Sequence, residues 1–302
     1  PGYGNGPYLR AAELALAIAA GIGKPFRIVI PLLYGASQKR ILEEEFGTNG
    51  AFILDEELGR IICSLAFEGQ SYGEYLKRWL LDVDRAGAEA RAYIRERYPR
   101  VAMEIARSPL LHFNVAPSYC ALFGCQSDIL RQAMQYDDIT IGRDVLQESS
   151  DKFLKMESGF TKRFITVPGT FEEIQDGDTP VPPIVALRKN TTEVPAPGVY
   201  VTTSGIPGLS SLAATAGRLG LPIYSNHPEK IPGSLFAPPS IVAHKNIVLH
   251  VARAGWGSVW LSLVTETPLL TPAYDPQDDP EIFFNNRRIE ELSLGAVDLG
   301  QS

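Results

Sequence analysis

The stretch that decides the fold runs from Phe236 to Gly295, and its centre, residues 253–258, reads RAGWGS. An apolar run, Ile247 to Val251, comes before this centre, and an apolar segment, Val259 to Val264, comes after it. The pattern predicts a buried strand, a glycine turn and the start of a helix. Such a turn presents backbone N–H groups at the positive end of a helix dipole, where they suit a phosphate. Arg253 adds a fixed positive charge and a forked set of donors.

A second turn of the same kind lies upstream. Residues 199–203 read VYVTT and predict a strand, and Ser204, Gly205 and Gly208 form the turn after it. The helix expected next carries apolar residues at helical spacing: Leu209, Leu212, Ala213, Ala216 and Leu219. Strands and helices alternate through the chain, which predicts parallel sheets with ligands at the carboxyl ends of the strands.

The stretch as a whole resembles the donor-binding box of nucleotide-sugar glycosyltransferases of the UDP/dTDP type, which have the two-domain GT-B fold. The matching segments are FAPP at 236–239, the apolar-x-x-His step at 241–244, RAGWGS at 253–258, Pro268, Pro272, Gln277, Asn286 and residues 289–295. The resemblance implies an α/β fold class with two Rossmann-like domains that face each other across a cleft. The acceptor-side domain would span residues 1–174, and the donor-binding domain residues 183–302.

The resemblance also implies a set of donor-binding residues. These are Ser204, Gly205, Phe236, Arg253, Gly255, Gly257, Ser258, Asp275 and Gln277. Phe236 would border the base, and Asp275 and Gln277 would bond to sugar hydroxyls. The chain departs from the family pattern at four places. Arg253 replaces a histidine beside the pyrophosphate, and Pro239 replaces a glutamine. Leu261 stands where plant enzymes carry a glutamate for the ribose. The acid that the family carries directly before the glutamine lies one residue earlier here, at Asp275, with Pro276 between it and Gln277.

The catalytic residues implied by the resemblance are Asn5 and His112. In the family, the opening turn carries the histidine that acts as base in many inverting members, and Asn5 is the nearest residue here. An asparagine takes no proton at neutral pH but can hydrogen-bond an acceptor hydroxyl; alternatively it is a turn residue that tolerates left-handed backbone. Two roles stay open for His112: the base in place of Asn5, and a hydrogen-bonded histidine of the core.

Composition excludes several classes of protein. The 302 residues make about two domains, and 45% hydrophobic with 21% charged residues is typical of a soluble globular protein. The net charge of −7 argues against nucleic acid as the main partner. The longest apolar runs fall short of the roughly 20 residues that span a bilayer, so no transmembrane segment is expected. Three cysteines without a disulfide framework indicate free thiols in a reducing, cytoplasmic setting.

No metal site is expected. Cys120 and Cys125 lack a second pair of ligands, and the acidic run at 275–279, DPQDD, is typical of a solvated loop. Asp137, Asp138 and Asp144 are likewise expected to be solvated. Residues 172–183, EEIQDGDTPVPP, shift in composition and predict the linker between the domains. In the first domain we expect strands at 26–31, 51–54, 101–106 and 164–167, and helices at 9–19, 39–46, 72–98 and 128–136.

The sequence therefore predicts a glycosyltransferase. It would move a sugar from a UDP- or dTDP-type donor to a small-molecule, lipid or glycan acceptor, without a separate cofactor. Two alternatives stay open. One is a non-catalytic nucleotide-sugar-binding relative, suggested by Asn5 and by the altered corner at Pro276 and Gln277. The other is a sugar-nucleotide epimerase on the same fold, but those enzymes bring several carboxylates and histidines to the cleft, and this chain has four histidines in all.

Overall fold

The computed structural model describes residues 6–23, 26–47, 50–67, 71–106, 111–122, 125–167, 174, 176–183, 185, 193–203 and 206–298. Its internal contacts divide the chain into two compact units, Pro1–Pro182 and Pro183–Ser302. Among the described residues, no helix has both the length and the hydropathy needed to span a bilayer.

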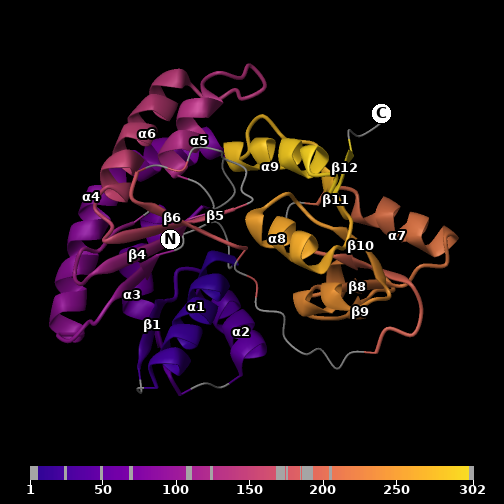
Figure 1. Ribbon diagram of the computed structural model, residues 1–302, viewed down its shortest axis with the longest axis horizontal. Coiled ribbons are helices and arrows are strands. Elements are labelled where there is room, and N and C mark those ends of the chain that lie inside the picture. The colour runs from indigo at the N-terminus through magenta and orange to yellow at the C-terminus, as the bar shows by residue number, and fades with distance from the viewer. Residues whose placement is uncertain are drawn as a thin grey trace. The chain divides into compact units, whose positions relative to one another are not determined.

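The first unit contains two parallel sheets (Figure 1). One pairs β1 (Ile28–Pro31) with β2 (Phe52–Asp55), and the other has the order β3 (Glu104–Ala106), β4 (Ser118–Leu122), β5 (Lys162–Thr166) and β6 (Asp178–Val181). The helices are α1 (Gly6–Ile22), α2 (Gly35–Phe46), α3 (Glu56–Ile61), α4 (Tyr72–Arg97), α5 (Gln126–Ala133) and α6 (Arg143–Glu157), with a 3-10 turn at Cys63–Leu65.

The predicted linker at 172–183 is wrong over residues 178–181, because these form β6 and pair with β5. The ladder places Asp178 beside Arg163, and the Arg163 Nε and Asp178 Oδ1 atoms lie 2.7 Å apart. β6 is an edge strand, so Pro180 costs no ladder bond on its open side. The acids expected to be solvated are exposed: Asp137, Asp138 and Asp144, the last in the first turn of α6, a helix that the sequence analysis did not predict.

Helix α4 spans 26 residues, and local side-chain hydrogen bonds account for its start. Ser71 and Glu74 form a reciprocal capping box. The buried side of the helix includes Trp79, which stacks on Phe153 of α6 with the ring centroids 4.3 Å apart. Helices α4 and α6 therefore pack side by side through an aromatic contact (Figure 1).

Replacing Trp79 by alanine is expected to lower the free energy of unfolding by about 3–5 kcal/mol, because the side chain is fully buried and its loss leaves a cavity. Leu81 lies two residues further along the same helix but is 83% exposed. Leu81→Ala is the matched control and should change stability by no more than about 0.5 kcal/mol. Urea unfolding of both variants is the measurement, and equal losses would contradict the packing described.

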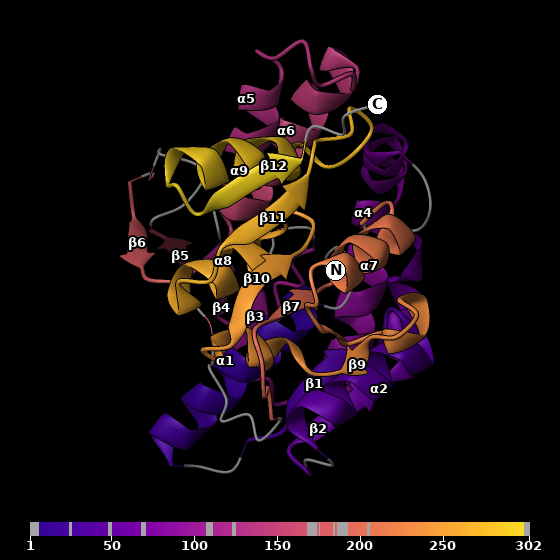
Figure 2. The same cartoon turned by 90° about the vertical axis from the view of Figure 1, so that its right-hand side faces the viewer.

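The second unit contains one parallel sheet of the order β12-β11-β10-β7-β8-β9. The strands are β7 (Gly198–Val201), β8 (Ile223–Ser225), β9 (Leu235–Phe236), β10 (Ile247–Val251), β11 (Leu269–Pro272) and β12 (Gly295–Asp298), and the helices are α7 (Leu209–Arg218), α8 (Trp256–Thr265) and α9 (Pro280–Glu291). Short 3-10 turns lie at Pro228–Lys230 and Pro239–Ala243. Figure 2 shows β12, β11, β10 and β7 following one another across the sheet.

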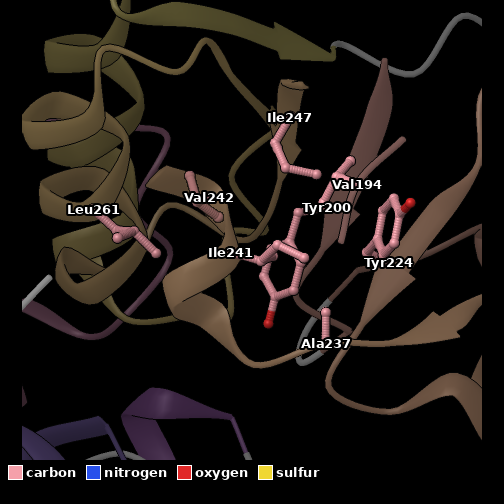
Figure 3. Close-up of a cluster of buried hydrophobic side chains, with 8 residues drawn as sticks. All are labelled: Val194, Tyr200, Tyr224, Ala237, Ile241, Val242, Ile247 and Leu261. Carbon is pink, nitrogen blue, oxygen red and sulfur yellow. The ribbon is translucent and has the colours of Figure 1, made fainter. Parts of the chain in front are cut away.

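The order of the strands reverses between β7 and β10. The chain builds outward from β7 through β8 to β9, then returns to the other side of β7 and builds outward through β10, β11 and β12. This reversal is the topological switch point of a doubly wound sheet. The sheet has a buried cluster on each face. One consists of Val194, Tyr200, Tyr224, Ala237, Ile241, Val242, Ile247 and Leu261 (Figure 3), and the other includes Val199, Val201, Ile223 and Val251.

Candidate functional site

The two predicted glycine turns start at the same edge of the sheet. Val201 and Val251, the last residues of β7 and β10, are partners in the parallel ladder, and the Thr202 N–H donates to the Val251 carbonyl at 2.9 Å. Ligands of open α/β sheets bind outside the carboxyl ends of the strands at this reversal. Ser204 and Gly205 lie outside the described residues, so the first turn is described only up to Thr203 and again from Ile206.

The second turn places the N-terminus of α8 at this edge. Gly255 is the N-cap, with φ −76° and ψ 150°. The Trp256 N–H donates to Glu281 Oε1 at 3.4 Å, and the Ser258 N–H donates to the Gly255 carbonyl at 3.0 Å. Among the described residues, no acceptor takes the Gly257 N–H between them. The start of α8 therefore offers an unpaired donor at the positive end of the dipole.

The two glycines of this turn are not required by the protein's own packing. A Cβ atom built on Gly255 or Gly257 meets nothing within 4 Å. The negative φ of Gly255 is open to any residue. The glycines instead leave open space beside the N–H groups, which lets a ligand approach the backbone closely.

Arg253 has a partner that the sequence analysis missed. Its Nε donates to Asp278 Oδ2 at 2.8 Å, and its Nη2 donates to Asp278 Oδ1, so the guanidinium and the carboxylate form a bidentate pair. Partial burial acts to lower the pKa of Arg253, but the hydrogen bonds and charge of Asp278 outweigh it and raise that pKa. The arginine is therefore charged and held in one orientation.

The loop between β11 and α9 holds Asp278 in place. The Asp278 N–H donates to the Asp275 carbonyl at 2.8 Å, and the Gln277 N–H donates to Asp275 Oδ1 at 2.9 Å. Asp279 caps α9 by accepting from the Glu281 N–H at 3.0 Å, and burial raises its pKa well above the ordinary value, with the charge of Glu281 adding to the effect. The prediction of a solvated loop is thus correct for Asp275 and wrong for Asp278 and Asp279.

Two buried side chains, Asn285 and His250, hold the turn in place. Asn285 of α9 donates through Nδ2 to the Ala254 carbonyl at 2.6 Å. His250 of β10 lies between two hydroxyls, with Nε2 3.1 Å from Thr202 Oγ1 and Nδ1 2.9 Å from Ser262 Oγ. It therefore joins the ends of β7 and β10 to α8. The sequence signal for His250 was a polar residue within an otherwise apolar run, and Asn285 had no comparable signal, because polar and charged residues follow it directly.

Phe236 and the two sugar-contacting candidates are surface residues. Phe236 is the last residue of β9 and is 58% exposed. It lies at the same carboxyl edge, two strands from β7, or about 10 Å at the usual strand spacing. Asp275 and Gln277 are exposed in the loop before α9. No cluster of three His, Cys, Asp or Glu side chains suited to a metal ion occurs within the described part of the chain.

His112 lies at the amino end of the strands of its own sheet, not at the carboxyl end, where ligands of open α/β sheets bind. Its Nε2 is 2.8 Å from Oγ of Ser118, the first residue of β4, and its ring stacks on Phe160 with centroids 4.7 Å apart. Burial lowers the pKa of His112, and the charge of Arg91 lowers it further. A position at the amino end of a parallel strand favours the second role considered for His112, a hydrogen-bonded core histidine. Asn5, the other catalytic candidate, lies outside the described residues.

Comparison with known proteins identifies the fold. No protein-family model and no curated protein matches the chain. The structure of LpCGTa in complex with UDP is similar at 15% identity and a TM-score of 0.58, over 100% of this chain and 84% of that one. Phytolacca americana UGT2, complexed with UDP-2fluoro-glucose and pterostilbene, is similar at 12% identity and a TM-score of 0.57, over 98% and 83%.

A third similar structure is a bacterial one. The Streptomyces sp. SF2575 glycosyltransferase SsfS6 matches at 12% identity and a TM-score of 0.52, over 92% of this chain and 81% of that one. At such identities the likeness is one of fold. It confirms the predicted fold class, an α/β chain with parallel sheets of the GT-B type.

The ring of His250 is expected to stay neutral in the folded protein down to about pH 3, because full burial lowers its pKa to about 3. The unfolded chain takes up this proton near the ordinary pKa of about 6.5, so between these values the unfolded state binds more protons. The free energy of unfolding should then fall with pH below about 6.5, by up to about 1.4 kcal/mol per unit from this group.

Two measurements check this expectation. NMR of the imidazole nitrogens should show one ring, assigned to His250 by mutation, that does not titrate between pH 7 and pH 4. Urea unfolding over the same range should give a shallower pH dependence for His250→Gln than for the parent. A His250 ring that titrates near its ordinary value would show that the network with Thr202 and Ser262 is not formed.

Proposed function

We propose that this protein transfers a sugar from a nucleoside diphosphate sugar, of the UDP or dTDP type, to an acceptor. The observation that carries the proposal is the turn at residues 253–258, which brings an arginine, an unpaired helix N–H and two unobstructed glycines to the switch point of the second unit. Two chains of similar fold were solved with UDP and with UDP-2fluoro-glucose. The resemblance of residues 236–295 to a donor-binding box supports the same assignment.

The chemistry required of the site is stabilisation of a leaving group. When the bond between the sugar and the diphosphate breaks, negative charge grows on the phosphate oxygens, and donors fixed beforehand lower the barrier. Arg253 uses two of its five N–H donors on Asp278, so three remain for a phosphate. Asp278 thereby orients the guanidinium without consuming it. The Gly257 N–H adds a donor from the start of α8.

The remaining candidates receive roles that follow from their places. Phe236, at the carboxyl edge two strands from β7, is assigned to the base, and the exposed Asp275 and Gln277 to sugar hydroxyls. We assign Ser204 and Gly205 to the diphosphate on the side of the first turn. Asn5 is assigned to the acceptor hydroxyl. In this assignment no separate cofactor or metal takes part, and the protein works in the cytoplasm.

UDP is expected to raise the melting temperature, because a ligand that binds only the folded state stabilises it by about 2.7 kcal/mol at a hundredfold excess over its Kd. Uridine, which lacks the diphosphate, is the control and should stabilise much less. If UDP, dTDP and other nucleoside diphosphates all leave the melting temperature unchanged at millimolar concentration, the proposal fails. Slow release of glucose from UDP-glucose separates a transferase from a protein that only binds nucleotide sugars, since a competent transferase leaks its donor to water.

Gly257→Ala is expected to weaken UDP binding more than tenfold, because the new methyl group fills the space beside the N–H donors and removes a charge-assisted contact. The same change should not destabilise the fold, since alanine is the better helix former by about 0.5–1 kcal/mol. Gly217, in α7, is exposed and equally unobstructed. Gly217→Ala is the matched control for calorimetric titration, and equal UDP affinity in both variants would mean that no ligand lies against α8.

A further inference from the structure

The first unit carries a pocket that the proposed sugar transfer does not use. It has a volume of about 190 Å³ and lies between α4, α6 and the loop at residues 111–114. Its charged lining consists of Arg91, Lys152, Lys155 and Asp84. Its apolar lining includes Val83, Leu111 and Met156. We propose that this pocket binds a small organic anion, with a carboxylate or phosphate-monoester head group on a compact apolar body.

The charges around the pocket favour an anion of low charge. Lys152 Nζ lies 2.6 Å and 2.5 Å from the two carboxylate oxygens of Asp84, so this pair is neutral as a whole. Arg91 and Lys155 supply two further positive charges. Glu104, which is not part of the lining, contacts the pocket's loop: its two oxygens accept the N–H groups of Phe113 and Asn114 at 2.8 and 3.1 Å. Over these five described side chains, the balance is an excess of one positive charge.

A hydrogen bond to the loop holds the Arg91 guanidinium in an orientation that suits ligand binding. Its Nε donates to the Phe113 carbonyl at 2.8 Å, which fixes the plane of the guanidinium against the loop. Within the described ranges, no acceptor takes the donors of its two terminal nitrogens, so these can serve a ligand. A planar fork fixed in this way matches a carboxylate or a phosphate better than a mobile ammonium does. Lys155 is exposed in the last turn of α6 and adds a flexible second charge.

The apolar part of the lining suits an organic body on the anion. A Cβ atom on Gly87 would lie 3.3 Å from Leu111 Cδ1, so the absence of a side chain lets Leu111 pack against α4 and form a wall. The neutral ring of His112 forms another part of the lining and is held by Phe160 and Ser118. The ligand thus meets charge on one side and hydrocarbon on the other.

The pocket belongs to the amino end of its sheet. Glu104 and Ser118, which contact the pocket's loop and His112, are the first residues of β3 and β4. Nucleotides of open α/β sheets bind at the opposite, carboxyl edge. The anion site is therefore additional to the proposed donor site, which lies in the second unit.

The test is calorimetric titration of the whole chain with benzoate and with phenyl phosphate, in the presence of saturating UDP to fill the proposed donor site. Both ligands should bind with a stoichiometry of one, and benzyl alcohol, which lacks the charge, should not. Lys155→Gln removes an exposed charge and should weaken binding about tenfold, the size of one charge-assisted contact. Arg91→Gln should weaken it at least as much. Lys39→Gln, at an exposed position on α2, is the control and should change nothing.

The outcomes separate the proposal from its competitors. Inorganic phosphate that binds as tightly as phenyl phosphate would overturn the role given to the apolar lining. Binding that Lys155→Gln leaves unchanged, or the absence of saturation at millimolar benzoate and phenyl phosphate, would overturn the site itself. If Arg91→Gln fails to fold, Lys155→Gln still tests the site, because Lys155 is exposed and its replacement should leave the fold intact. A protein that takes these anions but not UDP would reject the proposed function and leave this site standing.

Discussion

The pairing of β7 with β10 is the constraint on which the second unit depends. Because Val201 and Val251 lie side by side in a parallel ladder, the segments that follow them must start from the same edge of the sheet. All other strands are added outward from this pair, β8 and β9 on one side and β11 and β12 on the other. The pair is fixed by buried clusters on both faces and by His250, which joins the two strand ends to α8. A slip of one residue would turn Val199 and Val201 to the wrong face and separate the turns.

The chemistry of the turn depends equally on a segment some 25 residues later. Asn285 holds the Ala254 carbonyl, Asp278 holds the guanidinium of Arg253, and Glu281 approaches the Trp256 N–H. All three come from α9 or the loop before it. The position of α9 is in turn set by β12, where a Cβ on Gly295 would clash with the Leu269 backbone, so only glycine allows this strand to lie against β11. The conformation of the turn at residues 253–258 is therefore fixed by tertiary contacts, although its sequence is local.

Prediction from the sequence succeeded for elements whose local residue pattern is enough to determine their structure. The strand at 247–251 was predicted to the residue, because an apolar run between the polar pair Lys245-Asn246 and a glycine-containing turn leaves little choice. β6 was missed because three prolines and four acids within 172–183 look like a linker, and its pairing with β5 is not visible in the local pattern. The glycine turn at residues 253–258 was predicted from its place between an apolar run and a helix start and from the resemblance to a donor-binding box. Their partners Asp278 and Asn285 were not, since the conformation of a loop and the facing of a helix are decided by packing elsewhere.

Two departures from the donor-box pattern, Arg253 and the altered loop before α9, are in contact in this structure. Arg253 replaces a histidine, and the acid expected before Gln277 is displaced to Asp275, while a further acid, Asp278, follows it. A histidine is short and needs no anchor, but an arginine has four rotatable side-chain bonds and must be held to present its fork. Asp278 supplies that anchor through both of its oxygens. The loop thus places a carboxylate against the arginine. Asp278 lies beside the proposed phosphate site, and its negative charge is matched by the cation that it orients. Arg253 without Asp278 would lack the partner that orients its guanidinium, and Asp278 without Arg253 would place an unpaired carboxylate beside the proposed phosphate site, so the two residues are expected to depend on each other.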